Sequence, residues 1–219
     1  MYTKQQIIDR IAKEKLIVIL RGVDKEKLIP LVQAMYEGGI RLLEITYNPS
    51  RPETDAQTAE QIDALVKRFG DKMLIGAGTV LTKKQVVLTH KAGGSFIISP
   101  NTDKSIIGKT CKLGMVSIPG ALTPSECVLA HNVGADFVKL FPVSDMGSAY
   151  LKALKAPLSH IRFLAVGGVN AQNAQEYLRA GASGVGIGSC LADKKLIAEG
   201  NFEKLAESSK TFVDAIKNA

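Results

Sequence analysis

The chain has 219 residues, 46% of them hydrophobic, so it is long enough to build one sizeable core, and we expect a single domain over residues 1–219. Its formal net charge is +7, but the basic residues form no run and do not alternate with aromatic side chains. This disfavours a nucleic-acid partner and leaves a solvated surface or a small anionic substrate. No apolar stretch reaches about 18 residues, so we expect no membrane partner.

Cysteine usage indicates a reducing compartment, and histidine usage argues against a metal site. The three cysteines, Cys111, Cys127 and Cys190, are an odd number without CxxC spacing, which argues against a disulfide framework and a zinc site. The histidines form no HxH or HExxH group. We therefore expect a cytoplasmic protein that holds no metal through its side chains.

The first predicted element is an amphipathic helix over residues 3–13, which does not read as a secretory leader. Thr3 and Gln6 form a capping box at its start. A unit then repeats along the chain: a short apolar strand, a capping signal, an amphipathic helix and a glycine. The predicted strands cover residues 16–21, 41–47, 73–79, 95–100, 115–119, 137–141, 162–166 and 184–188.

Capping residues mark the predicted helix starts between these strands. The candidate capping boxes are Thr54/Gln57, Thr82/Gln85 and Thr123/Glu126, and Asp24 and Asn170 are suited to cap two further helices. Eight strand–helix units rich in Val, Ile and Leu imply an α/β fold with parallel strands covered by helices. A doubly wound open sheet is one arrangement, but the number of units favours a closed (β/α)8 TIM barrel with an N-terminal helix.

Two charged residues stand inside predicted apolar strands. Lys139 lies in the middle of strand 137–141, where an ammonium group is costly unless it is paired or has lost its proton. Glu44 interrupts strand 41–47 in the same way. The pair is either catalytic, with Lys139 as a Schiff-base nucleophile and Glu44 as a proton carrier, or a structural ion pair.

Barrel active sites lie at the carboxyl ends of the strands, so these positions indicate chemistry. Gly167-Gly168 and Gly188-Ser189 end the last two predicted strands, where backbone N–H groups commonly hold a phosphate, although glycine turns also have purely steric roles. Arg21 ends the first strand, and its side chain suits a planar carboxylate or a surface salt bridge.

Taken in order, these strand ends resemble the KDPG/KHG aldolase family, class I aldolases that act on 2-keto-3-deoxy-6-phosphogluconate or 4-hydroxy-2-oxoglutarate. The resemblance spans nearly the whole chain. The matching segments are residues 19–21, 37–40, 43–46, 76–80, 98–100, 118–120, 138–142, 167–170 and 186–189.

The resemblance implies roles for ten residues. Lys139 would form the Schiff base, Glu44 would be the general acid/base, Arg21 and Thr79 would hold the pyruvate carboxylate, Pro100 and Phe141 would pack the pyruvyl group, and Gly167, Gly168, Gly188 and Ser189 would line the phosphate end. The family also implies a homotrimer that acts on a small, phosphorylated 2-keto acid without a metal or cofactor.

The chain departs from the family pattern at two positions. Many members carry an arginine four residues after the glutamate, and it helps to bind the substrate carboxylate. This chain has Asn48 there, so Arg21 must provide more of the carboxylate binding. The family often has threonine before the paired glycines, where Val166 offers no hydroxyl. Both departures concern the choice of substrate and leave Lys139 and Glu44 in place.

The resemblance thus predicts a carbon–carbon lyase that cleaves 2-keto-3-deoxy-6-phosphogluconate to pyruvate and glyceraldehyde 3-phosphate, or 4-hydroxy-2-oxoglutarate to pyruvate and glyoxylate. Two alternatives stay open from the residues themselves. One is a phosphate-binding barrel isomerase or epimerase, in which Glu44 moves protons and Lys139 acts only as a cation. The other is a sugar-phosphate-binding protein without catalytic activity.

Overall fold

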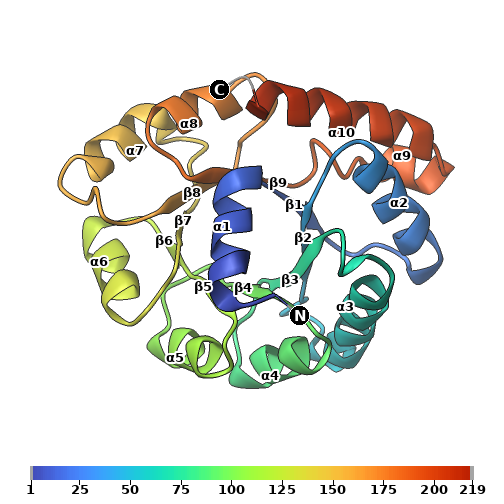
Figure 1. Cartoon of the computed structure of the whole chain (residues 1–219), viewed down its shortest axis with the longest axis horizontal. Helices are drawn as coiled ribbons and strands as arrows, with labels where there is room; N and C mark the ends of the chain where they lie inside the picture. The colour runs from blue at the N-terminus through green and yellow to red at the C-terminus, as the bar shows by residue number, and fades with distance from the viewer. Residues whose placement is uncertain (1, 218–219) are drawn as a thin grey trace.

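The computed structural model describes residues 2–217 and shows parallel strands surrounded by helices (Figure 1). The strands are β1 (Leu16–Leu20), β2 (Leu42–Thr46), β3 (Leu74–Gly78), β4 (Phe96–Ile98), β5 (Val116–Ile118), β6 (Gly120–Ala121), β7 (Val138–Leu140), β8 (Phe163–Val166) and β9 (Gly184–Ile187). Their pairing order is β5-β4-β3-β2-β1-β9-β8-β7-β6. Each predicted strand is therefore present.

The sheet closes where β5 and β6 follow one another along the chain. Only Pro119, which has no N–H to give to a ladder, separates them. Its carbonyl still accepts a hydrogen bond of 2.8 Å from the backbone N–H of Lys139. Because β5 pairs with β4 and β6 pairs with β7, the two segments act as one barrel strand. The predicted (β/α)8 TIM barrel is confirmed.

Most of the helices surround the outside of the barrel, and the first one covers one of its ends. They are α1 (Lys4–Glu14), α2 (Lys25–Glu37), the short 3-10 helix η1 (Pro52–Thr54), α3 (Asp55–Phe69), α4 (Lys83–Lys91), α5 (Lys104–Lys112), α6 (Pro124–Asn132), α7 (Gly147–Lys155), α8 (Ala174–Arg179), α9 (Lys194–Glu199) and α10 (Phe202–Lys217). Between residues 2 and 217, none of them combines the length and the apolar character that a membrane crossing needs.

Most of the predicted helix caps are present. The capping boxes of α1, α4 and α6 form as expected, at Thr3/Gln6, Thr82/Gln85 and Thr123/Glu126. The box expected at Thr54 is wrong, because this residue ends η1 and its hydroxyl donates to the Arg51 carbonyl at 2.7 Å. Asp24 also makes no side-chain cap. The residue that precedes α8 is Asn173 and not Asn170, which instead accepts from the backbone N–H groups of Gln172 and Asn173 in the turn before the helix.

Helix α1 covers the end of the barrel at which the strands begin, and it crosses the centre of the view in Figure 1. Its residues Ile7, Ile8 and Ile11 are buried with an inner group of strand side chains that includes Leu42 and Phe137. A second, larger apolar layer lies between the strands and the outer helices. Burial of α1 therefore makes one end of the barrel a closed floor and leaves chemistry to the other end.

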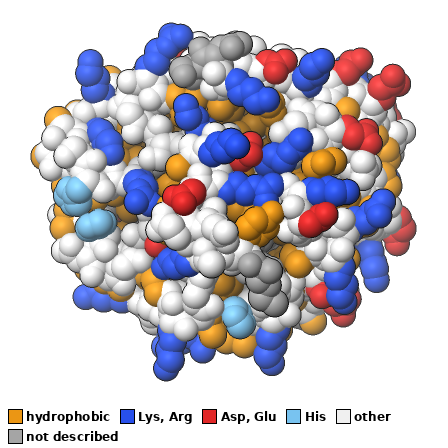
Figure 2. Space-filling model, in the orientation of Figure 1, with side chains coloured by type: hydrophobic (Ala, Val, Ile, Leu, Met, Phe, Trp, Pro, Cys, Tyr) orange, Lys and Arg blue, Asp and Glu red, His pale blue; other side chains and the backbone are white. Residues whose placement is uncertain are grey.

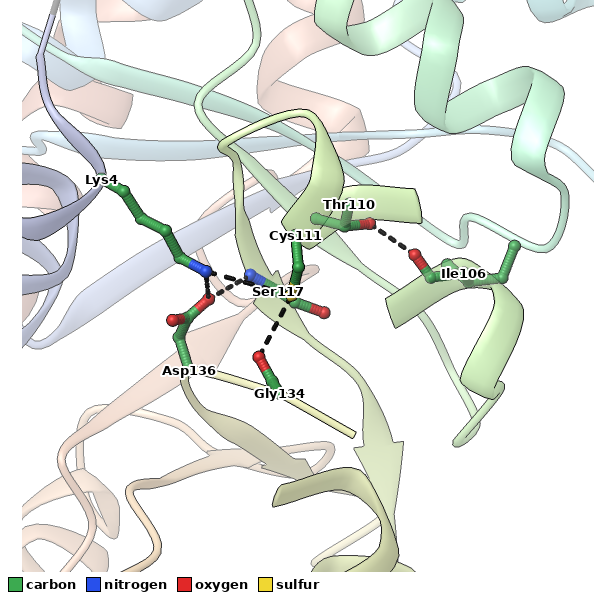
Figure 3. A network of polar contacts seen from close by, with 7 residues as sticks. All are labelled: Lys4, Ile106, Thr110, Cys111, Ser117, Gly134 and Asp136. Atoms are coloured by element: carbon green, nitrogen blue, oxygen red, sulfur yellow. Dashed lines mark hydrogen bonds and ion pairs between the residues drawn. The ribbon is translucent and has the colours of Figure 1, made fainter. Parts of the chain in front are cut away.

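A network of polar contacts fastens α1 to this floor (Figure 3). The Lys4 ammonium lies 3.0 Å from the Asp136 carboxylate, which also accepts the backbone N–H of Ser117 at 2.8 Å. The Cys111 thiol, next to Lys4, donates to the Gly134 carbonyl at 3.2 Å. Elsewhere on this face, basic side chains are dispersed with acidic ones among them (Figure 2).

Candidate active site

Glu44 and Lys139 lie on opposite walls of the barrel. Strands β1, β9 and β8 separate β2, which carries Glu44, from β7, which carries Lys139. Leu42 and Phe137, each two residues earlier, belong to the inner core, and because side chains alternate along a strand, Glu44 and Lys139 also point inward. Both are buried, with 2% of Glu44 and 8% of Lys139 exposed.

The two charged groups do not form the structural ion pair that the sequence left open. Among the ion pairs and hydrogen bonds of residues 2–217, none joins the Lys139 ammonium to the Glu44 carboxylate. Burial lowers the pKa of Lys139, opposed by the charge of Glu44. Burial likewise raises the pKa of Glu44, opposed by Lys139 and Arg21. The site therefore favours a neutral amine facing a carboxyl group that holds its proton more tightly than usual.

Arg21 lies at the rim of the same space. It follows the last residue of β1, and its side chain is exposed. Its positive charge acts on both buried groups, lowering the pKa of Glu44 and that of Lys139. An anion that enters the barrel mouth therefore meets a guanidinium close to the amine, which suits a substrate carboxylate.

Phe141 and the glycines after β8 continue the wall beside Lys139. The Lys139 Nζ lies 4.6 Å from the centre of the Phe141 ring. Gly167, with φ +93°, lies against this ring, and a Cβ there would come within 3.2 Å of it. Gly168 has less space still, since a Cβ would lie 2.8 Å from that of Ser144. Both glycines are thus fixed by contacts as well as by backbone conformation.

The last glycine turn lies beside this one. Val166 pairs with Gly186 in the β8–β9 register, so the segments that follow the two strands are neighbours. Gly188 is partly buried and Ser189 is exposed. The predicted phosphate end is therefore brought together as one rim.

Thr79 and Pro100 complete the predicted set on the opposite side. Thr79 has φ +55°, a conformation that a β-branched residue rarely adopts, and strained backbone of this kind clusters at functional sites. The Pro100 carbonyl lies against Gly120, at 2.3 Å from where a Cβ would be. Because Gly120 pairs with Lys139, Pro100 is one strand away from the lysine. Eight of the ten predicted site residues follow the carboxyl ends of the strands, and Glu44 and Lys139 point inward from within β2 and β7.

Sequence reasoning missed two features that support these residues. Gly78 leaves room for the Glu44 side chain, because a Cβ there would lie 1.5 Å from a Glu44 carboxylate oxygen. Gln85, expected only to cap α4, also accepts the N–H of Leu81 at 2.8 Å and donates to the buried Asp55 carboxylate at 3.0 Å. Gly78 lies within segment 76–80, which matches the family pattern, so the sequence offered a signal for it. No pattern near Asp55 or Gln85 in the sequence indicated that the two side chains face each other.

A cleft of about 870 Å³ lies beside the mouth, between α2 and α3. Arg21, Thr46 and Asn48 contribute to its lining together with polar residues of α3. It therefore reaches the rim of the barrel from the outside, on the side where Arg21 stands.

Comparisons with known proteins agree with this geometry. The family model described as KDPG and KHG aldolase matches residues 7–208. The chain is 38% identical over 208 residues to the 2-dehydro-3-deoxy-6-phosphogalactonate aldolase of Escherichia coli K12, covering 94% of this chain and 97% of that one. It is 36% identical to a probable aldolase of the same name from Rhizobium meliloti, covering 92% of each.

A solved structure is similar over the same length. The KDPG aldolase of Legionella pneumophila, with pyruvate captured as a covalent carbinolamine intermediate, has a TM-score of 0.84 to this chain and is 29% identical. The match covers 94% of this chain and 98% of that one.

Proposed function

Because this chain belongs to the KDPG and KHG aldolase family of lyases, we propose that it is a class I aldolase whose Lys139 forms a Schiff base with a 2-keto-3-deoxy-6-phospho sugar acid. The observation that carries the proposal is a buried lysine without an ion pair, facing a buried glutamate across the barrel. Its support from outside the chain is the carbinolamine of pyruvate in the similar Legionella enzyme.

Lys139 begins the reaction as a neutral amine. Desolvation lowers its pKa, so the nucleophilic form is present nearer to neutral pH than in a solvated lysine. The amine attacks the C2 carbonyl carbon, the carbonyl oxygen gains a proton, and the loss of one water from the carbinolamine leaves an imine. In its protonated form this imine withdraws electrons from the C3–C4 bond.

Glu44 carries the protons of the following steps. Its carboxylate accepts the proton of the C4 hydroxyl, and the O–H electron pair forms the carbonyl of the departing aldehyde. The electron pair of the broken C3–C4 bond forms the C2=C3 double bond of the enamine, and the protonated imine nitrogen accepts the C=N pair. A proton then returns to C3, and water hydrolyses the imine to pyruvate and free Lys139. A raised pKa suits Glu44 to both halves of this cycle, because the group must give back the proton that it takes.

The relatives and one residue, Val166, favour one sugar acid. The Escherichia and Rhizobium proteins are named for the 6-phosphogalactonate compound, the C4 epimer of the gluconate substrate that the family resemblance implies. Val166 is buried at the end of β8 and presents methyl groups where many family members have a hydroxyl. We therefore propose the galactonate epimer as the preferred substrate, ahead of the gluconate epimer and 4-hydroxy-2-oxoglutarate.

The test is the mass of the protein after incubation with pyruvate and borohydride, followed by peptide mapping. A single reduced pyruvyl adduct on Lys139 supports the mechanism, and its absence from folded protein with excess pyruvate contradicts it. Steady-state cleavage of the two epimers and of 4-hydroxy-2-oxoglutarate then ranks the substrates. Equal or faster cleavage of the gluconate epimer contradicts the preference proposed here.

Three further outcomes bear on the two alternatives and on the assembly. The isomerase or epimerase would be favoured if the protein still converted a sugar phosphate after treatment with pyruvate and borohydride. Stabilisation by sugar phosphates without turnover would favour the binding protein. The homotrimer stays a prediction, for which light scattering should give about three times the chain mass of 23.4 kDa.

A further inference from the structure

The hydroxyl of Thr46 is buried without a partner. Only 7% of the residue is exposed, and within residues 2–217 its Oγ1 is the buried side-chain polar atom that makes no hydrogen bond. Buried hydroxyls in proteins are nearly always hydrogen-bonded, and an unpaired one costs free energy. A bound ligand that accepts or donates a hydrogen bond would explain why this buried hydroxyl has no partner in the free protein.

The strand places this hydroxyl at the inner edge of the barrel mouth. Thr46 is two residues after Glu44 and four after Leu42, which is part of the inner core, so all three share the inward face of β2. Ile45 and Tyr47, the residues on either side of Thr46, belong to the outer layer. Thr46 is thus the next inward position beyond Glu44 toward the mouth.

No side chain of the neighbouring strands forms a hydrogen bond with Thr46. On one side it pairs with Gly78, which has none. On the other side Leu20 pairs with Ile45, so Arg21 follows beside Thr46, and both residues line the same cleft. Thr79 comes directly after Gly78. Thr46 therefore stands between the two residues expected to hold the substrate carboxylate.

We propose that Thr46 is a substrate-contacting residue whose hydroxyl donates a hydrogen bond to the carboxylate of the 2-keto acid. This inference rests on the proposed function, since the carboxylate is that of the substrate bound to Lys139. A carboxylate accepts up to about four hydrogen bonds, so Arg21 alone does not saturate it. Asn48 is uncharged, so it does not supply the second cation that an arginine would supply at this rim. A neutral hydrogen-bond donor such as the Thr46 hydroxyl can therefore complete the carboxylate site.

The experiment compares Thr46→Val with Thr46→Ser. Valine keeps the shape of threonine and removes the hydroxyl, so the pyruvate concentration that half-saturates borohydride trapping should rise about tenfold or more, as for a hydrogen bond to a charged group. The same variant should melt at a higher temperature than the wild type, because it no longer buries an unpaired hydroxyl. Thr46→Ser should restore pyruvate binding.

The matched control is Thr110→Val on α5. Thr110 is also buried, but its hydroxyl already donates to the Ile106 carbonyl at 2.8 Å, and it lies near the Lys4–Asp136 network at the floor of the barrel (Figure 3). Its removal should leave pyruvate binding unchanged and should not raise the melting temperature. Only the unpaired hydroxyl combines weaker binding with higher stability.

A second measurement, the rise in melting temperature that pyruvate causes, separates failure of this proposal from failure of the Schiff base. If wild-type protein gains stability from pyruvate but no adduct on Lys139, the covalent mechanism fails, and loss of that gain in Thr46→Val still supports the carboxylate contact. If Thr46→Val binds pyruvate as the wild type does, the contact is overturned. If the wild type shows neither adduct nor stabilisation, both proposals are overturned.

Discussion

The two ends of the barrel treat their buried charges in opposite ways. At the floor, Lys4 and Asp136 meet at 3.0 Å, and Asp136 also accepts a backbone N–H. At the mouth, Lys139 and Glu44 are more deeply buried yet stay unpaired with each other. At the floor the polar groups bind one another and stabilise the fold. At the mouth they stay available for a substrate, and leaving them unpaired lowers the stability of the protein.

The largest expected effect comes from Lys139→Met. It removes the buried amine that we propose forms the imine, so turnover and the pyruvate adduct should both be lost, as mass spectrometry after borohydride would show. Lys155→Met is the control, because the Lys155 amine has a lowered pKa too but bonds two backbone carbonyls. It should leave the adduct on Lys139, and near-normal turnover by Lys139→Met would rule out the Schiff-base mechanism.

Glu44→Gln should come next. The amide fills the same space but carries no proton between steps, so kcat should fall roughly a hundredfold or more. Because imine formation needs mainly the amine, some pyruvate adduct should still form on Lys139. Single-turnover trapping and steady-state cleavage measure the two effects separately, and an unchanged kcat would remove Glu44 from proton transfer.

Gly78→Ala tests whether the mouth depends on the placement of the Glu44 carboxylate. The new methyl group would occupy the position of the Glu44 carboxylate and displace it. A displacement of a catalytic group by about 1 Å can lower the rate roughly a hundredfold. Gly108→Ala on α5 is the matched control, since a Cβ there meets nothing within 4 Å. That variant should keep full activity and gain about 1 kcal/mol of unfolding free energy. Equal kinetics in both variants would contradict the role of Gly78.

Gln85→Ala and Gln6→Ala remove the same capping-box residue from opposite ends of the barrel. Gln85→Ala also leaves the buried Asp55 carboxylate without its partner, so we expect a loss of about 2 kcal/mol in denaturant unfolding. The loop after Thr79 should loosen, raising the KM for the sugar acid about tenfold. Gln6→Ala should cost about 1 kcal/mol and leave the KM unchanged. Parallel changes of KM in the two variants would show that Gln85 only stabilises α4.

The smallest effect is expected for Lys4→Met at the floor. The pair with Asp136 is partly exposed, so its loss should cost about 1 kcal/mol or less, and Asp136 keeps its hydrogen bond from Ser117. Activity should stay at the wild-type level. A clear fall in kcat, with the unfolding curve unchanged, would contradict the separation between the two ends.

Local patterns in the sequence determined the order of the elements and the identity of Lys139 and Glu44. Apolar runs, capping residues and glycines act over a few positions, so they placed the strands within one or two residues. The error at Thr54 has the same origin, because a competing backbone carbonyl three residues earlier was not visible in the capping pattern. A charged residue within an apolar strand is likewise a local signal.

Only the tertiary structure decided what faces what across the barrel. The absence of a Lys139–Glu44 ion pair, the room that Gly78 leaves and the bond between Gln85 and Asp55 depend on strand register and barrel closure. So does the unpaired hydroxyl of Thr46, which depends on a glycine of the neighbouring strand. These relations join residues far apart in the chain, and no local propensity encodes the distance between them.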